Sequence, residues 1–219
     1  MDGSLGRTVV FPAFPRFAFF MSLPLLWSLL AFPARPATAA PAVAYDFDDG
    51  AGGFLNAPAL TVSHLSADAW GDTDKSFGAA TGNPGKAISA SHFNDGNTFE
   101  LSLSVEPGYA LSVDGYSFDH RVSGTGPKLW ILSLGGAQVA SGTTVVDDFT
   151  SAGGALNLTR LTGEVTVGLY ANGAGTKAGT WRIDNFQLNG RVDPLPTPLP
   201  ASILLLVSAL ICLPLRRRS

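Results

Sequence analysis

The chain has 219 residues, of which 46% are hydrophobic and 14% are charged, and its formal net charge is −3. Residues 41–192 contain 15 acidic and 8 basic side chains, and this acidic balance argues against nucleic-acid binding through phosphate contacts. The single cysteine, Cys212, lies near the C-terminus, so the central segment has no disulfide and no thiol nucleophile.

Residues 1–40 have the layout of a secretory signal peptide. Arg7 and Arg16 supply positive charge, residues 17–32 form an apolar stretch, and a small-x-small cleavage site ends at Ala39. Cleavage directly after this site or one residue later fits equally well, and an uncleaved N-terminal membrane anchor is the alternative. We expect export through the secretory translocon.

Residues 41–192 form one domain whose apolar residues alternate over short runs. In Thr98–Val105 every second residue from Phe99 onwards is apolar, which is the pattern of a strand buried on one face. Turn signals such as Gly135-Gly136 separate the runs. Further strands are expected at 109–118 (broken at Asp114-Gly115), 128–134, 138–140, 143–149, 156–161, 164–170 and 180–188. The predicted fold is all-β, a single β-sandwich.

The last expected strand changes phase. Trp181 and Ile183 share one parity, whereas Phe186 and Leu188 share the other. A strand keeps its buried face across such a flip when an extra residue is inserted, so we expect a bulge near Asp184-Asn185.

Both ends of this domain resemble known modules. Residues 45–50, Tyr-Asp-Phe-Asp-Asp-Gly, are similar to the opening strand of jelly-roll modules of the galactose-binding-like and carbohydrate-binding type. Residues 181–188, Trp-Arg-Ile-Asp-Asn-Phe-Gln-Leu, are similar to their closing strand. The resemblance implies a jelly-roll-like sandwich.

Aspartates near the two terminal strands form a candidate cation site. The terminal strands of a jelly roll are usually neighbours, so carboxylates of Asp46 and Asp48 could meet that of Asp184. Ca²⁺ prefers such hard oxygen ligands, and the resemblance implies a structural Ca²⁺ there. The alternative is that these aspartates shape turns and keep strand edges soluble.

Trp70 is the best candidate for an exposed ring that stacks on a sugar, because it lies in the polar segment 69–72. The alternative is that it caps one end of the sandwich. Trp130 and Trp181 alternate with strand residues and are expected in the core.

Signs of catalysis are missing. The chain has no Gly-x-Ser-x-Gly and no His-Glu-x-x-His segment. Glycoside hydrolysis needs a placed pair of carboxylates, and Glu100, Glu106 and Glu164 form no recognisable pair. We therefore expect no enzyme activity, and a hydrolase acting on glycans is the minority alternative.

The C-terminus has three parts. Residues 193–201 are proline-rich and stiff, residues 202–215 are apolar and uncharged, and the basic cluster Arg216, Arg217 and Arg218 follows. About 15 apolar residues at ~1.5 Å each span ~22 Å, less than the ~30 Å hydrocarbon core, which suggests a processed or transient anchor.

This order resembles the PEP-CTERM sorting signals of Gram-negative bacteria. Pro198, Leu199, Pro200 and Ala201 match the VPLPA-CTERM variant, with Thr197 in place of its valine. Residues 118–127 are similar to a segment of many surface proteins sorted in this way. The resemblance implies recognition by a membrane-embedded exosortase, tail removal, and display at the cell surface or in the extracellular matrix.

The sequence thus predicts a signal peptide (1–40), a β-sandwich (41–192), a sorting motif and spacer (193–201) and a hydrophobic helix with its Arg cluster (202–219). We expect an exported protein with a structural or adhesive role, associated with extracellular polysaccharide or biofilm. A carbohydrate-binding module with a defined sugar site is the first alternative.

Overall fold

The computed structural model describes residues 40–74 and 76–196. The chain divides into two units, 1–37 and 38–219, and the described residues all belong to the second. The predicted signal peptide and the hydrophobic tail lie outside the described residues. Within the described part of the chain, no helix has both the length and the apolar character needed to cross a membrane.

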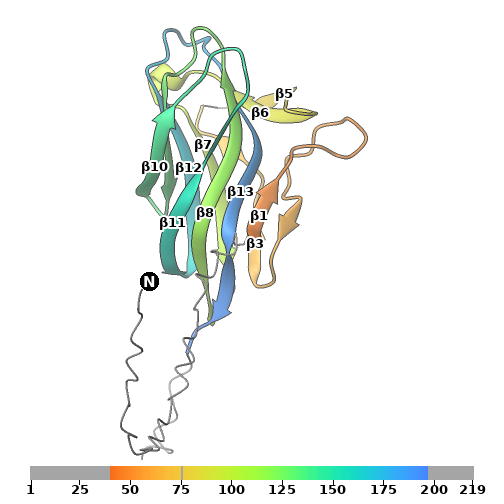
Figure 1. Ribbon diagram of the computed structural model, residues 1–219, viewed down its shortest axis with the longest axis vertical. Coiled ribbons are helices and arrows are strands. Elements are labelled where there is room, and N and C mark those ends of the chain that lie inside the picture. Colours follow the sequence, from red (N-terminus) through yellow and green to blue (C-terminus); the bar gives the residue numbers. More distant parts are fainter. Residues whose placement is uncertain (1–39, 75, 197–219) are drawn as a thin grey trace, which may run out of the picture. The chain divides into compact units, whose positions relative to one another are not determined.

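Two antiparallel sheets form a sandwich (Figure 1), which confirms the predicted all-β fold. The seven-stranded sheet runs in the order β11 (Thr150–Leu161), β8 (Tyr109–Val122), β13 (Trp181–Pro194), β1 (Pro41–Tyr45), β2 (Leu60–Thr61), and β6 (Lys86–Ala90) joins β13 to β5 (Gly78–Thr81). The six-stranded sheet runs in the order β10 (Ala137–Thr143), β9 (Leu129–Leu134), β12 (Gly163–Asn172), β7 (Thr98–Val105), β3 (Leu65–Ala67), and β4 (Gly71–Asp72) pairs with β7. A short 3₁₀ turn, η1 (Phe93–Asp95), precedes β7.

The first and last strands are neighbours, as expected. β1 pairs antiparallel with β13, and Tyr45 lies opposite Phe186. This pairing places the N-terminal residues of the domain beside its final strand. Residues far apart in the sequence can therefore share one site.

The core consists of the inward-facing residues of both sheets. Trp181 packs against Phe93 and Phe99, with ring centroids 5.5 Å apart in both pairs. Trp130 packs edge-on against Phe118 at 5.1 Å. The expectation that both tryptophans lie in the core is confirmed.

Two details of the predicted strands differ from the structure. The predicted strand 143–149 is not formed, because β10 ends at Thr143 and the following residues connect it to β11 in the other sheet. Within this connection Asp147 has a left-handed backbone, with φ 67°. β8 continues to Val122 through the predicted break at Asp114-Gly115, but its pairing with both β13 and β11 shifts register there, between Val113 and Gly115. Glycine suits position 115 because it has no side chain; a Cβ there would lie only 3.0 Å from the carbonyl oxygen of Gly154.

The predicted bulge in the last strand is confirmed. The pairing of β13 with β8 shifts register between Asp184 and Gln187, and Asn185 has φ 49°. The extra residue returns Phe186 to the core after Ile183. The side chain of Asp184 is completely buried, and its Oδ2 accepts a hydrogen bond from Asn83 N in the turn between β5 and β6.

Candidate functional site

Tyr170 presents an aromatic ring on the outer face of the six-stranded sheet. Val165, Val167 and Leu169 fill the inner face of β12, so the residue that follows them points outward. Tyr170 is 38% exposed, and it is the one aromatic residue among the exposed large hydrophobic side chains of residues 40–74 and 76–196.

The ring of Tyr170 lies over Gly168 of the same strand. A Cβ on Gly168 would be 2.7 Å from Cε2 of Tyr170 and 2.8 Å from Oγ of Ser133. Gly168 therefore leaves the space into which the ring settles. Part of the ring is covered by the strand, and the side chain remains exposed enough to contact a ligand.

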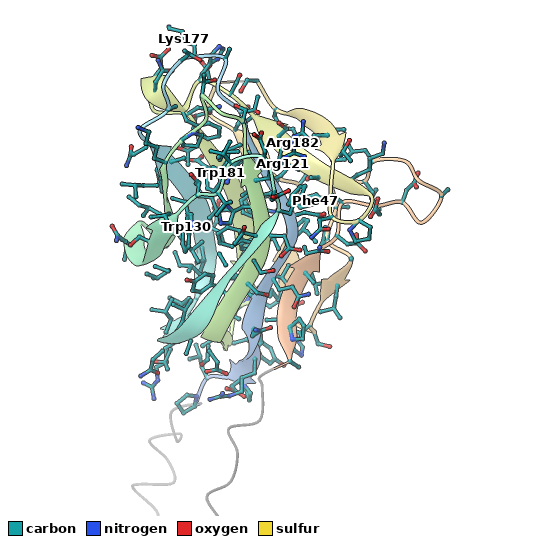
Figure 2. The ribbon with its side chains drawn as sticks, turned by 45° about the horizontal axis from the view of Figure 1, so that its top comes forward. Phe47, Arg121, Trp130, Lys177, Trp181 and Arg182 are labelled. Atoms are coloured by element: carbon teal, nitrogen blue, oxygen red, sulfur yellow. The ribbon has the colours of Figure 1, made fainter. Side chains whose placement is uncertain are left out.

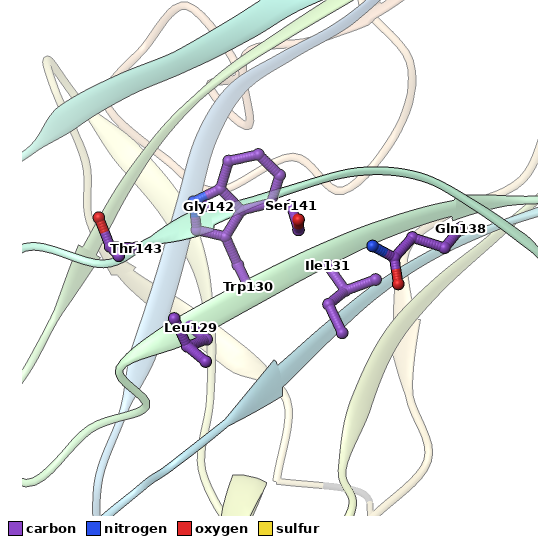
Figure 3. Close-up of a pocket in the computed structure, with 7 residues that line it drawn as sticks. All are labelled: Leu129, Trp130, Ile131, Gln138, Ser141, Gly142 and Thr143. Atoms are coloured by element: carbon purple, nitrogen blue, oxygen red, sulfur yellow. The ribbon is translucent and has the colours of Figure 1, made fainter.

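A shallow depression lies on β9 and β10 (Figure 3), and one of its lining residues, Ile131, is the direct cross-strand partner of Tyr170. Its volume is about 280 Å³, close to the lower end of the roughly 300–1,000 Å³ range of small-molecule sites. Ile131 lies opposite Tyr170 on one side and opposite Ser141 on the other, so one row crosses three strands. The lining residues are Leu129, Trp130, Ile131, Gln138, Ser141, Gly142 and Thr143.

The depression combines apolar and polar groups. Figure 3 shows Leu129 and Ile131 on one side of β9 and Trp130 on the other. Leu129 is 49% exposed, whereas the ring of Trp130 is buried against Gly142, where a Cβ would come within 2.5 Å of it. Gln138 adds an amide and Ser141 and Thr143 add hydroxyl groups. The exposed ring of Tyr170, together with these aliphatic and hydrogen-bonding groups, suits a ligand that has C–H faces and hydroxyl groups.

The predicted role of Trp70 as an exposed ring is wrong. Trp70 is 3% exposed, and it packs edge-on against Phe186 with centroids 4.8 Å apart. Its backbone N–H and C=O are both bonded to the side chain of Asn56, at 3.0 and 2.7 Å. These bonds hold the polar segment 69–72 against the core. Because the ring of Trp70 is buried, it cannot stack on a sugar.

Two of the three predicted calcium ligands meet at the turn between β5 and β6. Oδ1 of Asp48 accepts a hydrogen bond from Lys86 N at 2.9 Å, and Oδ2 of Asp184 accepts one from Asn83 N at 2.5 Å. Glycines permit both approaches. A Cβ on Gly82 would lie 2.5 Å from Asp184 Oδ2, and one on Gly85 would lie 2.1 Å from Asp48 Oδ2.

Asp46 does not join them. Its side chain is exposed, and Oδ1 accepts a hydrogen bond from Asp48 N at 3.4 Å. Among residues 40–74 and 76–196, no three His, Cys, Asp or Glu side chains are grouped closely enough to hold a metal ion. The predicted three-carboxylate set is therefore not assembled, because the chain turns at Phe47, whose φ is 57°.

The environment of Asp184 is unfavourable for a charge. Burial, and then the nearby carboxylates of Asp119 and Asp48, raise its pKa to about 6, against hydrogen bonds from Asn83 N and Asn185 N that lower it. The carboxylate of Asp119 is itself bonded to Asn185 Nδ2 at 2.9 Å and to Ser151 Oγ at 2.5 Å.

The predicted sorting motif cannot be placed. Pro198, Leu199, Pro200, Ala201 and the Arg216–Arg218 cluster lie outside the described residues. Ahead of them, Leu195 N donates to Gly108 O at 2.7 Å, so the last described residues of the spacer lie at the turn between β7 and β8.

Comparisons with known proteins agree with a β-sandwich and extend no further. No protein family and no curated protein matches the sequence. The solved structures that match include carbohydrate-binding modules. The CBM36-1 domain of a xylanase from the hindgut metagenome of Trinervitermes trinervoides is 13% identical, with 58% of this chain and 98% of that chain covered and a TM-score of 0.43.

Two others are similar at the same level. The CBM22-1 xylan-binding domain of Paenibacillus barcinonensis Xyn10C is 12% identical over 70% of this chain and 97% of that chain, with a TM-score of 0.43. A CBM36 module in complex with calcium and xylotriose is 18% identical over 56% of this chain and 100% of that chain, with a TM-score of 0.36. Likenesses this remote concern the arrangement of strands, and the function of this chain depends on its own residues.

Proposed function

We propose that the domain is a non-catalytic, glycan-binding β-sandwich that is displayed outside the cell. The observation that carries the proposal is the exposed ring of Tyr170, seated on Gly168 beside the depression of β9 and β10. Sugar rings stack their C–H faces on such rings, and hydroxyl and amide groups at the edge bind the sugar hydroxyls. Glu100, which lies opposite Gly168 on β7, supplies a further acceptor.

The positions of the outward-facing carboxylates support a non-catalytic role. Glu164 pairs with Ser104 on β7, four residues from Glu100. At ~3.3 Å per residue, the backbone positions of the two are about 13 Å apart along the sheet, and the Glu164 carboxylate is engaged by Ser102, whose Oγ donates to Oε1 at 3.3 Å. The third candidate, Glu106, is bonded to His64 Nδ1 at 2.8 Å.

Retention on insoluble polysaccharides tests the glycan proposal. The mature domain, its Tyr170→Ala variant and a Leu60→Ala control would be compared on xylan, mixed-linkage β-glucan and immobilised dextran. Leu60 is also an exposed hydrophobic residue but lies on β2 of the other sheet. We expect Tyr170→Ala to lose retention and the control to keep it. Equal retention of all three proteins, or none by the unmodified domain on any matrix, would remove this site.

Delivery to the outside is proposed from the two ends of the sequence. The signal peptide supports export, and the order of proline motif, apolar block and arginine cluster supports sorting by an exosortase and association with extracellular polysaccharide. Intact mass of the protein from its native host tests this. We expect the mass of a chain that ends between Pro198 and Ala201. The mass of a chain that still contains Arg218 would mean that the tail is a permanent membrane anchor.

A structural Ca²⁺ at the turn between β5 and β6 is a second proposal, narrower than the sequence suggested. Asp48 and Asp184 would hold the ion, with backbone carbonyls completing its six to eight oxygens. The observation that favours it is the buried carboxylate of Asp184 beside the half-buried carboxylates of Asp119 and Asp48, because a cation would relieve their mutual repulsion. The melting temperature should rise with CaCl₂ and stay unchanged with MgCl₂; no response to CaCl₂ would leave the two aspartates as ties for the turn.

A further inference from the structure

Two arginines stand side by side on the outer face of the seven-stranded sheet. Arg121 of β8 and Arg182 of β13 are direct partners in the antiparallel ladder, and Figure 2 shows them at one place on the domain. Their chain neighbours fill the core below: His120, Val122, Trp181 and Ile183. Both arginines are half-buried and start from Cα atoms about 4.5–5.5 Å apart.

Neither arginine has an ion-pair partner among residues 40–74 and 76–196. Elsewhere in this part of the chain, Arg191 and Lys177 pair with aspartates. The carboxylates in the neighbouring row are committed to other donors, Asp119 to Ser151 and Asn185, and Asp184 to the backbone of Asn83 and Asn185. In a domain with 15 acidic and 8 basic residues, two adjacent cations are thus left without an anion.

Such a pair is unfavourable unless something binds it. Like charges directly opposite each other in a sheet are destabilising, and partial burial weakens the screening by salt. One of the two is also held in place, since Arg182 Nη1 donates to Thr81 O at 3.4 Å. The planar guanidinium groups favour a planar, bidentate anion, which is the geometry of a carboxylate.

We propose that Arg121 and Arg182 bind the carboxylate groups of an acidic polysaccharide. The positive charge of the pair selects an anionic ligand. That this anion belongs to a polysaccharide rests on the proposed function, in which glycans are the ligands of the domain. The arginine pair and the Tyr170 ring lie on different sheets, so the domain can hold two polysaccharide chains at once. Because the domain as a whole is acidic, binding depends on short-range bonds at this pair and not on long-range attraction.

Affinity electrophoresis in alginate, a polyuronate, tests the pair in a Tyr170→Ala background that removes the aromatic platform. The test variant carries Arg121→Gln and Arg182→Gln. The matched control carries Arg160→Gln and Lys128→Gln, which removes the same charge from exposed residues on other strands or loops. Because the test variant can no longer donate charge-assisted hydrogen bonds from this place, we expect its alginate binding to weaken by about tenfold or more, while the control keeps its affinity.

Three results would overturn the proposal: no alginate binding by the Tyr170→Ala protein, equal weakening in both double variants, or binding of poly-L-glutamate as tight as that of alginate. The last would assign the pair to acidic chains in general. The Tyr170 background separates the two sites. Loss of neutral-glycan retention with intact alginate binding, or the reverse, tells which proposal fails.

Discussion

Gly168 and Tyr170 are spaced so that the ring of the second fills the position of the missing side chain of the first. The Cβ that Gly168 lacks would lie 2.7 Å from Cε2 and 3.2 Å from Cζ of Tyr170. Real Cβ atoms do not approach a ring this closely, so an alanine here would move the ring. The glycine thus sets the orientation of the proposed sugar platform.

Gly168→Ala should therefore weaken glycan binding with little effect on stability. The atoms in the way are the ends of the Tyr170 and Ser133 side chains, which can move aside. We expect binding to neutral polysaccharide to fall by roughly three- to tenfold, or about 0.7–1.4 kcal/mol, with the melting temperature nearly unchanged. Affinity electrophoresis and thermal melts would measure both, and unaltered binding would contradict the seating of the ring.

Trp70→Ala should have the opposite profile. Its ring fills the core between Tyr45 and Phe186, so truncation leaves a cavity. Substitutions of this kind cost about 3–5 kcal/mol. Urea unfolding should show this loss, while the protein that remains folded still binds glycan. Lost binding with full stability would restore Trp70 as a contact residue.

The raised pKa of Asp184, about 6, makes its contribution to stability depend on pH. Between the ordinary aspartate value near 4 and about 6 the folded state binds more protons than the unfolded state, so this contribution falls as pH rises through that window and is smallest above it. Unfolding free energies of the unmodified domain and Asp184→Asn should diverge in this sense from about pH 4 to pH 7. A constant difference would contradict a buried carboxylate.

His120 should act in the opposite direction. Burial lowers its pKa, although Asp119 opposes the shift, and its Nδ1 has no partner in the described part of the chain. Below about pH 6.5 the unfolded state gains a proton that the folded state resists, so stability is lost as pH falls. His120→Phe, which keeps a ring against Phe118 and Trp130, should remove this loss of unfolding free energy. If His120→Phe lost as much unfolding free energy at low pH as the unmodified domain, the imidazole would be protonated in the folded domain.

The sequence predicted what depends on local alternation. Thr98–Val105 is a strand with the bounds that its pattern indicated, and the parity change between Ile183 and Phe186 located the bulge. The same rule could have found Tyr170, because the alternation of Val165, Val167 and Leu169 leaves the next residue on the outer face. The outward position of Tyr170 could therefore be predicted from the sequence. Its packing over Gly168 and its pairing with Ile131 depend on the three-dimensional structure.

Other features depend on contacts that no local pattern reveals. Trp70 lies among polar residues and is buried only because Asn56, 14 residues earlier, bonds to its backbone. Asp48 and Asp184 were expected to meet across neighbouring terminal strands, yet they meet through the turn between β5 and β6. The arginine pair likewise joins residues that are 61 positions apart in the sequence and become partners through the register of β8 with β13.

The central claim is that the outer face around Tyr170 binds glycan, and mapping of backbone amide shifts by NMR tests it most directly. The mature domain would be titrated with hexasaccharides derived from xylan and from mixed-linkage β-glucan. We expect the shifts to gather on β9, β10 and β12, at Ile131, Ser141, Gly168 and Tyr170. Shifts confined to the other sheet or to the loops at the ends of the sandwich, with these four amides unmoved, would contradict the account.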